Sequence, residues 1–154
     1  MNLPPTFQIP DNIKTSDFLF RKLTARDVYL DYIAVMSSID IINKTRGGSW
    51  PTKDLTFEDD LIDLGWHQRE FENGSSFAYT VFNPDNTKCL GCFYFYNAGF
   101  RKGIDPSYDV DISFWVTQEA YDNGLYEKLY QEIKEFIKPW PFKNPFFSND
   151  VLPE

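Results

Sequence analysis

The sequence is poor in the residues that bind metals, with two cysteines and one histidine among 154 residues. Cys89 and Cys92 form one C-x-x-C motif, which in other proteins is redox-active or supplies half of a zinc site. No second cysteine pair completes such a site. In a regular strand, residues three positions apart point to opposite faces. We therefore expect two structural cysteines and no metal site, with a redox or zinc protein as the weaker alternative.

Basic residues are also scarce, because 15 Lys and Arg stand against 23 Asp and Glu, for a net charge of −8. The sequence lacks the basic surface that binding to nucleic acid requires, and its negative net charge disfavours binding to an anionic membrane. This charge would steer a cationic amine more readily than an anion.

No apolar run approaches the roughly 20 residues that span a bilayer. The first ten residues, MNLPPTFQIP, lack the basic and apolar regions of a signal peptide. We expect a cytoplasmic protein without a membrane partner.

Apolar residues are plentiful at 42%, and aromatic residues at 18%, which is typical of a folded protein with a thick core. The length favours one domain. We expect a Pro-rich N-terminal arm over residues 1–16 and a single domain over 17–154.

Hydrophobic periodicity and turn residues predict the order β-α-α-β-β-β-α-(β). Helices are expected to begin after Thr24 and Thr56, each with an aspartate three residues on, and Gly91 is expected to mark a bulge. Expected strands cover 18–23, 77–82, 88–96 and 109–116, with a short last one within 145–152. This order indicates an α+β fold, a mixed sheet with helices on its faces.

Residues 109–138 organise the chain as a strand, a short turn and an amphipathic helix. Alternation places Val110, Ile112, Phe114 and Val116 on one face, and Asp109, Asp111, Ser113 and Trp115 on the other. The turn at 121–124 ends in Gly124, and in many α/β folds such a unit holds a phosphate at the helix N-terminus.

The order of elements resembles the GNAT acetyltransferase superfamily over about residues 18–138. SFAYTV followed by LGCFY resembles its central hairpin, and VDISFWV resembles its fourth strand. The resemblance implies an α/β/α-layered fold with a mixed, mostly antiparallel sheet, truncated before the family's C-terminal helix and strand. It implies transfer of an acetyl group from acetyl-CoA to an amine.

The resemblance also implies site residues. The cofactor would lie on Phe114, Trp115 and Val116 and on Tyr121, Asn123, Gly124 and Leu125, of which only Gly124 matches the family's diphosphate motif. The Tyr126 ring would crowd this turn, and the nearby Glu119 and Asp122 would repel a diphosphate. Asp111 aligns with a strand glutamate that can serve as the base through a water. No residue inherits by alignment the family's tyrosine that protonates the departing thiolate. Tyr126 and Tyr130, one turn apart on the last helix, are candidate donors, with core or boundary packing as the alternative.

Alternatives stay open at this level. Asp111 can instead be a solvent-facing strand carboxylate, and Asp109 would raise the pKa of Asp111 if both were desolvated. His67 is a weaker candidate base. The chain can also be a noncatalytic GNAT-like module that has lost CoA binding and binds a ligand or a protein. An open sheet edge would favour a homodimer. The amine acceptor, small molecule or peptide, is not identified.

Overall fold

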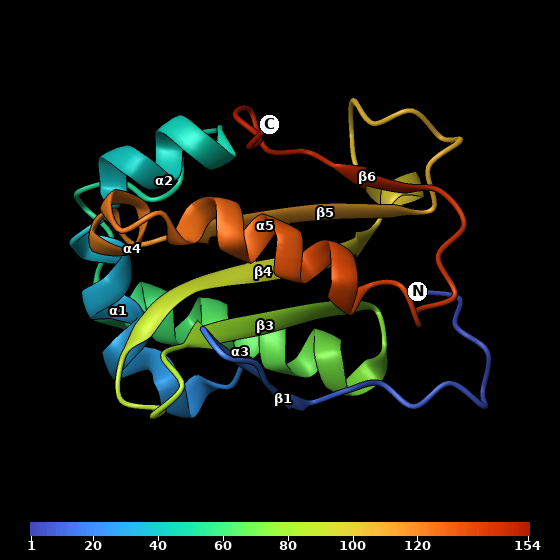
Figure 1. The fold of residues 1–154 in the computed structure, drawn as a ribbon, viewed down its shortest axis with the longest axis horizontal. Helices are drawn as coiled ribbons and strands as arrows, with labels where there is room; N and C mark the ends of the chain where they lie inside the picture. Colours follow the sequence, from blue (N-terminus) through green and yellow to red (C-terminus); the bar gives the residue numbers. More distant parts are fainter.

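Segments rich in aromatic and β-branched residues form a six-stranded sheet at the centre of the protein (Figure 1). The computed structural model describes all 154 residues. The strands lie side by side in chain order: β1 (Asn12–Lys14), β2 (Leu19–Lys22), β3 (Ser76–Phe82), β4 (Cys89–Asn97), β5 (Val110–Val116) and β6 (Pro145–Phe147). All neighbours are antiparallel except β5 and β6, which are parallel. This confirms the predicted mixed, mostly antiparallel sheet.

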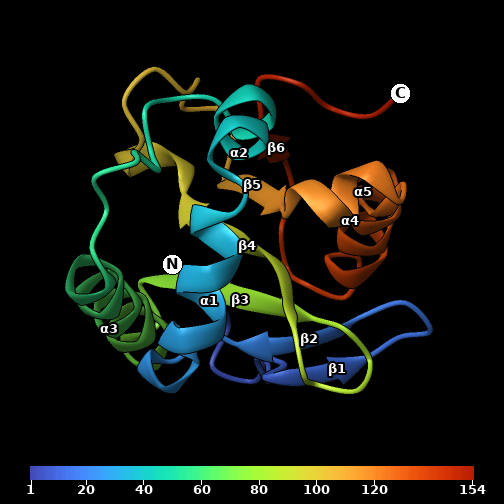
Figure 2. The same ribbon diagram turned by 90° about the vertical axis from the view of Figure 1, so that its left-hand side faces the viewer.

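Helices cover both faces of the sheet. Figure 2 shows α1, α2 and α3 on one side and α4 and α5 on the other. Their bounds are α1 (Val28–Met36), α2 (Ile39–Arg46), α3 (Phe57–Asn73), α4 (Gln118–Asp122) and α5 (Leu125–Phe136), and short 3-10 helices span Ala25–Asp27 and Ala98–Phe100. None of the helices combines the length and the apolar composition that crossing a lipid bilayer requires.

The helix expected to begin after Thr24 is divided into α1 and α2 at Ser37 and Ser38. The Ser37 hydroxyl donates to the Ala34 carbonyl (3.0 Å), and the Ser38 hydroxyl accepts from the Gln118 backbone N–H (2.9 Å). Serine side chains that bond nearby backbone groups compete with helix continuation. The α3 prediction is confirmed, since Thr56 and Asp59 form a capping box and Gly74 ends the helix with φ +75°.

The expected N-terminal arm contains an edge strand. Residues 12–14 form β1, and the Tyr79 hydroxyl donates to the Pro10 carbonyl. Both sheet edges, β1 and β6, are only three residues long. Short edge strands limit pairing with other chains, so the open edge that would favour a homodimer is small. The homodimer stays a prediction.

A β-bulge interrupts β4 where the sequence predicts one. Phe82 pairs with Cys89 and Val81 pairs with Gly91, so Leu90 has no partner on β3. The extra residue reverses the alternation, and both cysteines belong to the core under α1–α3. The expectation that the two sulfurs point to opposite faces is therefore wrong, because it assumed a regular strand.

Gly91 is required by a close approach to β5. A Cβ atom built on Gly91 would lie 2.0 Å from the Trp115 carbonyl oxygen, whereas one on Gly65 in α3 meets no atom within 4 Å. We expect Gly91→Ala to lower the free energy of unfolding by about 1–3 kcal/mol through forced backbone movement. Gly65→Ala is the matched control and should raise it by about 0.5–1 kcal/mol. Urea denaturation measures both, and equal midpoints for Gly91→Ala and wild type would contradict the prediction.

Candidate functional site

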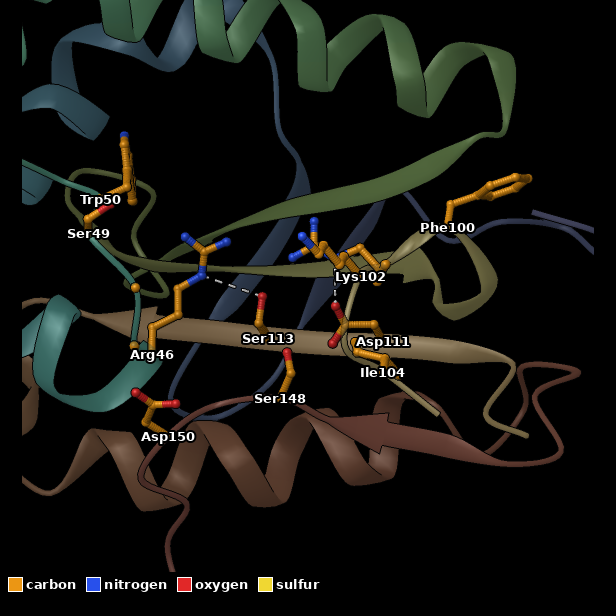
Figure 3. Close-up of a pocket in the computed structure, with 13 residues that line it drawn as sticks. Arg46, Ser49, Trp50, Phe100, Lys102, Ile104, Asp111, Ser113, Ser148 and Asp150 are labelled. Carbon is orange, nitrogen blue, oxygen red and sulfur yellow. Dashed lines mark hydrogen bonds and ion pairs between the residues drawn. The ribbon is translucent and has the colours of Figure 1, made fainter. Parts of the chain in front are cut away.

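The largest cavity, of about 560 Å³, lies at the edge of β5 where β6 leaves it (Figure 3). Three loops and one strand line it: the segment after α2, the loop after β4, the chain after β6, and β5 itself. The side chains that carry charge into it are Arg46, Arg101, Lys102, Asp111 and Asp150. These come from distant parts of the sequence, and only the sheet brings them together.

Asp111 is buried at the floor of this cavity. Its side chain is 0% exposed, and its Oδ2 accepts a hydrogen bond from Nε of Arg101 at 3.0 Å. Its Oδ1 has no hydrogen-bond partner. The Arg101 guanidinium also lies over the Tyr96 ring, 4.7 Å from its centroid. Asp111 is therefore not a solvent-facing carboxylate, and one of its oxygens is buried without a hydrogen-bond partner.

Asp109 does not act on Asp111 as expected. It is only partly buried, and its two oxygens accept from the backbone N–H groups of Lys143 (2.6 Å) and Asn144 (3.1 Å). The desolvation that the expectation required is absent. Asp109 instead fixes the chain just before β6.

Arg46 and Lys102 supply cationic groups without an acidic partner. The Arg46 guanidinium lies 4.9 Å from the Tyr94 ring centroid and 5.6 Å from that of Trp50, and its Nε is 3.5 Å from Oγ of Ser113. Neither Arg46 nor Lys102 forms an ion pair. The cavity thus has three cationic side chains against two carboxylates, although the whole chain carries a net charge of −8.

His67 lines a neighbouring hollow of about 170 Å³ together with Arg46, Trp50 and two tyrosines. Its Nε2 lies 3.5 Å from a carboxylate oxygen of Asp63, and its ring centroid is 5.2 Å from that of Tyr94. No sequence pattern places His67 next to Arg46. The two groups meet because α3 and the end of α2 cover the same face of the sheet.

Beyond Ile112, the backbone of β5 is paired by a side chain instead of a strand. Ser148 N–H donates to the Ile112 carbonyl (2.9 Å), after which the chain leaves the sheet. The Asn149 amide then bonds both backbone groups of Phe114: its Oδ1 accepts from N–H at 3.0 Å and its Nδ2 donates to C=O at 2.8 Å. β5 and β6 diverge after Ile112, and we call the opening between them at Phe114 the wedge. The side-chain amide of Asn149 fills this wedge.

Tyr126 is held by the same C-terminal segment. Its hydroxyl donates to the Val151 carbonyl (2.6 Å) and accepts from Nδ2 of Asn149 (2.8 Å), and burial raises its pKa to about 12. Its ring stacks on Phe114 with centroids 4.8 Å apart, on the α5 face of the sheet. Asp111 lies on the opposite face, so the two predicted catalytic residues do not share one side of β5.

The predicted phosphate turn is a short helix followed by Gly124. Thr117 caps α4 by accepting from Ala120 N–H (3.2 Å), and Gly124 begins α5 with φ +76°. A Cβ atom on Gly124 would meet no atom within 4 Å, and the Tyr126 ring points inward onto Phe114. The expectation that this ring crowds the turn is therefore wrong.

The other predicted cofactor residues surround this turn. The Tyr121 ring packs against Tyr126 at 5.6 Å, and Asn123 Nδ2 donates to the Glu119 carbonyl at 2.9 Å. Phe114 and Val116 belong to the hydrophobic core between the sheet and α5, and Leu125 packs against this core. The Trp115 side chain lies on the other face of the sheet, where its Nε1 donates to the Tyr94 hydroxyl (2.9 Å).

One of the two acids near the turn has a counter-charge. Glu119 is ion-paired to Lys88, whereas Asp122 accepts from the neutral amide of Gln118 (2.8 Å), which brings no positive charge. The expected repulsion of a diphosphate is therefore reduced at Glu119 only.

Sequence reasoning did not identify Arg46, Lys102, Asn149 or Asp150 as site residues. Arg101 and Lys102 are adjacent in the sequence without any motif around them, and residues 148–150 lie in the range 145–152, where only a short strand is expected. Their proximity to Asp111 depends on contacts across the fold.

No family model matches the sequence, and no curated protein sequence matches it. Solved structures do match. The RimL alpha-N-acetyltransferase of ribosomal protein L7/L12, in complex with coenzyme A, is 14% identical, with a TM-score of 0.63 over 83% of this chain and 68% of its own.

Two further matches agree with the first. A Bordetella pertussis protein described as GNAT-family is 15% identical (TM-score 0.62; 82% and 72% of the two chains). The microcin C7 self-immunity acetyltransferase MccE, in complex with acetyl-CoA and AMP, is 16% identical (TM-score 0.60; 83% and 67%). The likeness shows that the chain has the GNAT fold.

The Arg101–Asp111 pair offers a direct test of the cavity. We expect Arg101→Ala to lower the free energy of unfolding by about 1–3 kcal/mol, because it leaves a buried carboxylate without its donor. Adding Asp111→Asn should recover part of this loss, since a neutral amide needs no counter-charge. Lys102→Ala, an exposed neighbour without an ion pair, should stay within about 0.5 kcal/mol of wild type. Urea denaturation measures each variant, and additive losses in the double variant would contradict the pairing.

Proposed function

Since the chain has the fold of GNAT acetyltransferases, we propose that it is an acetyl-CoA-dependent N-acetyltransferase. The observation that carries this proposal is the wedge at Phe114, where β5 and β6 separate beside a charged cavity that contains Asp111. A strand edge that no neighbouring strand pairs, next to a carboxylate, can hold a cofactor and an acceptor at the same place. The acceptor is an amine.

The start of α5 fits a diphosphate. Gly124 has no side chain, so no side-chain cap takes the first backbone N–H groups of α5. Helix N-termini of this kind bind phosphate through backbone N–H groups and the helix dipole. The open space at Gly124 leaves room for such a group.

The wedge fits the amide-containing arm of coenzyme A. Asn149 places a primary amide against the N–H and C=O of Phe114, so this edge of β5 accepts an amide in good hydrogen-bonding geometry. An amide of the cofactor would make the same two hydrogen bonds. Asn149 would have to move away to permit this.

When bound, acetyl-CoA supplies the thioester that the acceptor amine attacks. The chain would hold the amine through Oδ1 of Asp111, which is buried without a partner beside the cavity and would have to be uncovered to take the proton of the amine. Arg101 keeps the other oxygen oriented. Arg46 and Lys102, which have no acidic partners, would attract an anionic group of the acceptor. We therefore propose an acceptor that carries both an amine and a carboxylate or phosphate.

One set of contacts favours a second candidate, a noncatalytic module on the same fold. Asn149 occupies both backbone groups of Phe114, and Val151 and Asn149 occupy the hydroxyl of Tyr126. If these contacts persist in solution, the wedge cannot hold a cofactor. The cavity would then bind a ligand or a protein segment without chemistry.

Calorimetric titration with acetyl-CoA separates the two candidates. We expect micromolar binding, and Asn149→Ala should tighten it about 10–30-fold because two competing hydrogen bonds to Phe114, each worth about 1 kcal/mol, are removed. Asn144→Ala is the matched control, since that exposed side chain bonds only the Ser107 carbonyl. An absence of binding in wild type and in Asn149→Ala at millimolar cofactor would favour the noncatalytic module.

The role of Asp111 is tested with an acceptor screen that measures release of free coenzyme A. Asp111→Asn should lower kcat/KM by about 100-fold or more through loss of the base, with the Kd for acetyl-CoA unchanged. Asp85→Asn, in the exposed β3–β4 turn, serves as the control. Full turnover by Asp111→Asn would show that Asp111 is not the base.

A further inference from the structure

Four potential metal ligands meet under the sheet, away from the cavity. The β-bulge at Leu90 places Cys89 and Cys92 on the same face of β4. Helix α1 brings Asp31 to this face, and α3 brings Asp60. The four residues are between 0% and 2% exposed. They come from three different elements, and nothing in the proposed acetyl transfer uses them.

The spacing of three of these residues suits a single ion. One ligand atom each from Asp31, Cys89 and Cys92 lies within 4.8 Å of the others. Sγ of Cys92 is 3.5 Å from Oδ1 of Asp31. Tetrahedral zinc has Zn–S and Zn–O distances of about 2.3 and 2.0 Å, which places neighbouring sulfur and oxygen ligands about 3.5 Å apart.

Asp60 lies beside this group of three. It is 0% exposed, its carboxyl group interacts with that of Asp31, and no other group of the protein bonds its oxygens. Two adjacent buried carboxyl groups share a proton or face a cation.

No lysine or arginine balances this cluster. Neither Asp31 nor Asp60 forms an ion pair, and His67 of α3 contacts Asp63 and Glu70 instead. Two buried carboxyl groups and two thiols therefore either carry protons or surround a cation. Thiolates select soft or borderline metals, which excludes magnesium and calcium and favours zinc.

We propose that Asp31, Cys89 and Cys92 bind zinc as a buried structural site that joins α1 to β4, with Asp60 of α3 beside it. The three ligands are closed off from solvent, which separates this site from the cavity. On binding, each thiol releases its proton to water as the Zn–S bond forms, and Asp31 binds as a carboxylate. The C-x-x-C motif can act in this way only because of the bulge, since a regular strand would separate the sulfurs.

The site is closed, so the metal is offered during folding. The protein is unfolded in guanidinium and refolded with zinc or with EDTA, desalted, and analysed by mass spectrometry for bound metal and by urea denaturation. We expect one zinc per chain and a higher urea midpoint for the zinc-refolded form. Refolding with cobalt should give the near-ultraviolet charge-transfer absorption of cobalt thiolates.

Three variants decide where the zinc is. Cys92→Ser should abolish the cobalt–thiolate absorption, and Asp60→Asn should weaken zinc retention about ten-fold or more. Asp63→Asn is the control, because Asp63 and His67 form a pair nearer the surface that could bind zinc adventitiously. If Cys92→Ser fails to fold, the wild-type cobalt spectrum and Asp60→Asn still decide. No retained zinc in wild type, or zinc that is lost only in Asp63→Asn, would overturn the proposal.

Discussion

Every backbone group of β5 needs a hydrogen-bond partner inside the protein, because the strand is buried along its whole length. β4 satisfies one edge from Gly91 to Asn97, whereas β6 satisfies the other for only three residues. The Asn149 side chain completes that edge at Phe114. Because of this unequal pairing, the sheet opens at Phe114. The cavity beside Asp111 and the wedge beside Phe114 both lie at this opening.

The sequence predicted those parts of the fold that depend on local patterns. Alternation assigned the two faces of β5, Thr56 with Asp59 marked the start of α3, and Gly91 marked the bulge. The prediction failed where one local irregularity reverses the facing of neighbouring side chains. A single extra residue at Leu90 moves Cys89 to the face that Cys92 occupies, and the spacing of three residues cannot reveal this by itself.

The chemistry of the cavity was less predictable, because composition gives the total charge and not its location. The acidic chain gathers Arg46, Arg101 and Lys102 around Asp111, and these residues come from the end of α2 and from the loop after β4. The preference for cationic acceptors inferred from the net charge therefore does not describe the site. An acceptor is influenced mainly by the charges within about one Debye length, roughly 8 Å at physiological salt.

Both candidate functions depend on whether a cofactor amide can replace the Asn149 side chain at Phe114. An amide of a cofactor that replaces Asn149 at Phe114 forms the two hydrogen bonds that it breaks, so this exchange alone contributes little net free energy. Affinity must then come from the diphosphate at the start of α5, where Glu119 and Asp122 stand beside Gly124. Lys88 offsets the charge of Glu119, whereas no ion pair offsets that of Asp122. The turn at Gly124 therefore bears on whether this fold can hold acetyl-CoA as much as the occupied wedge does.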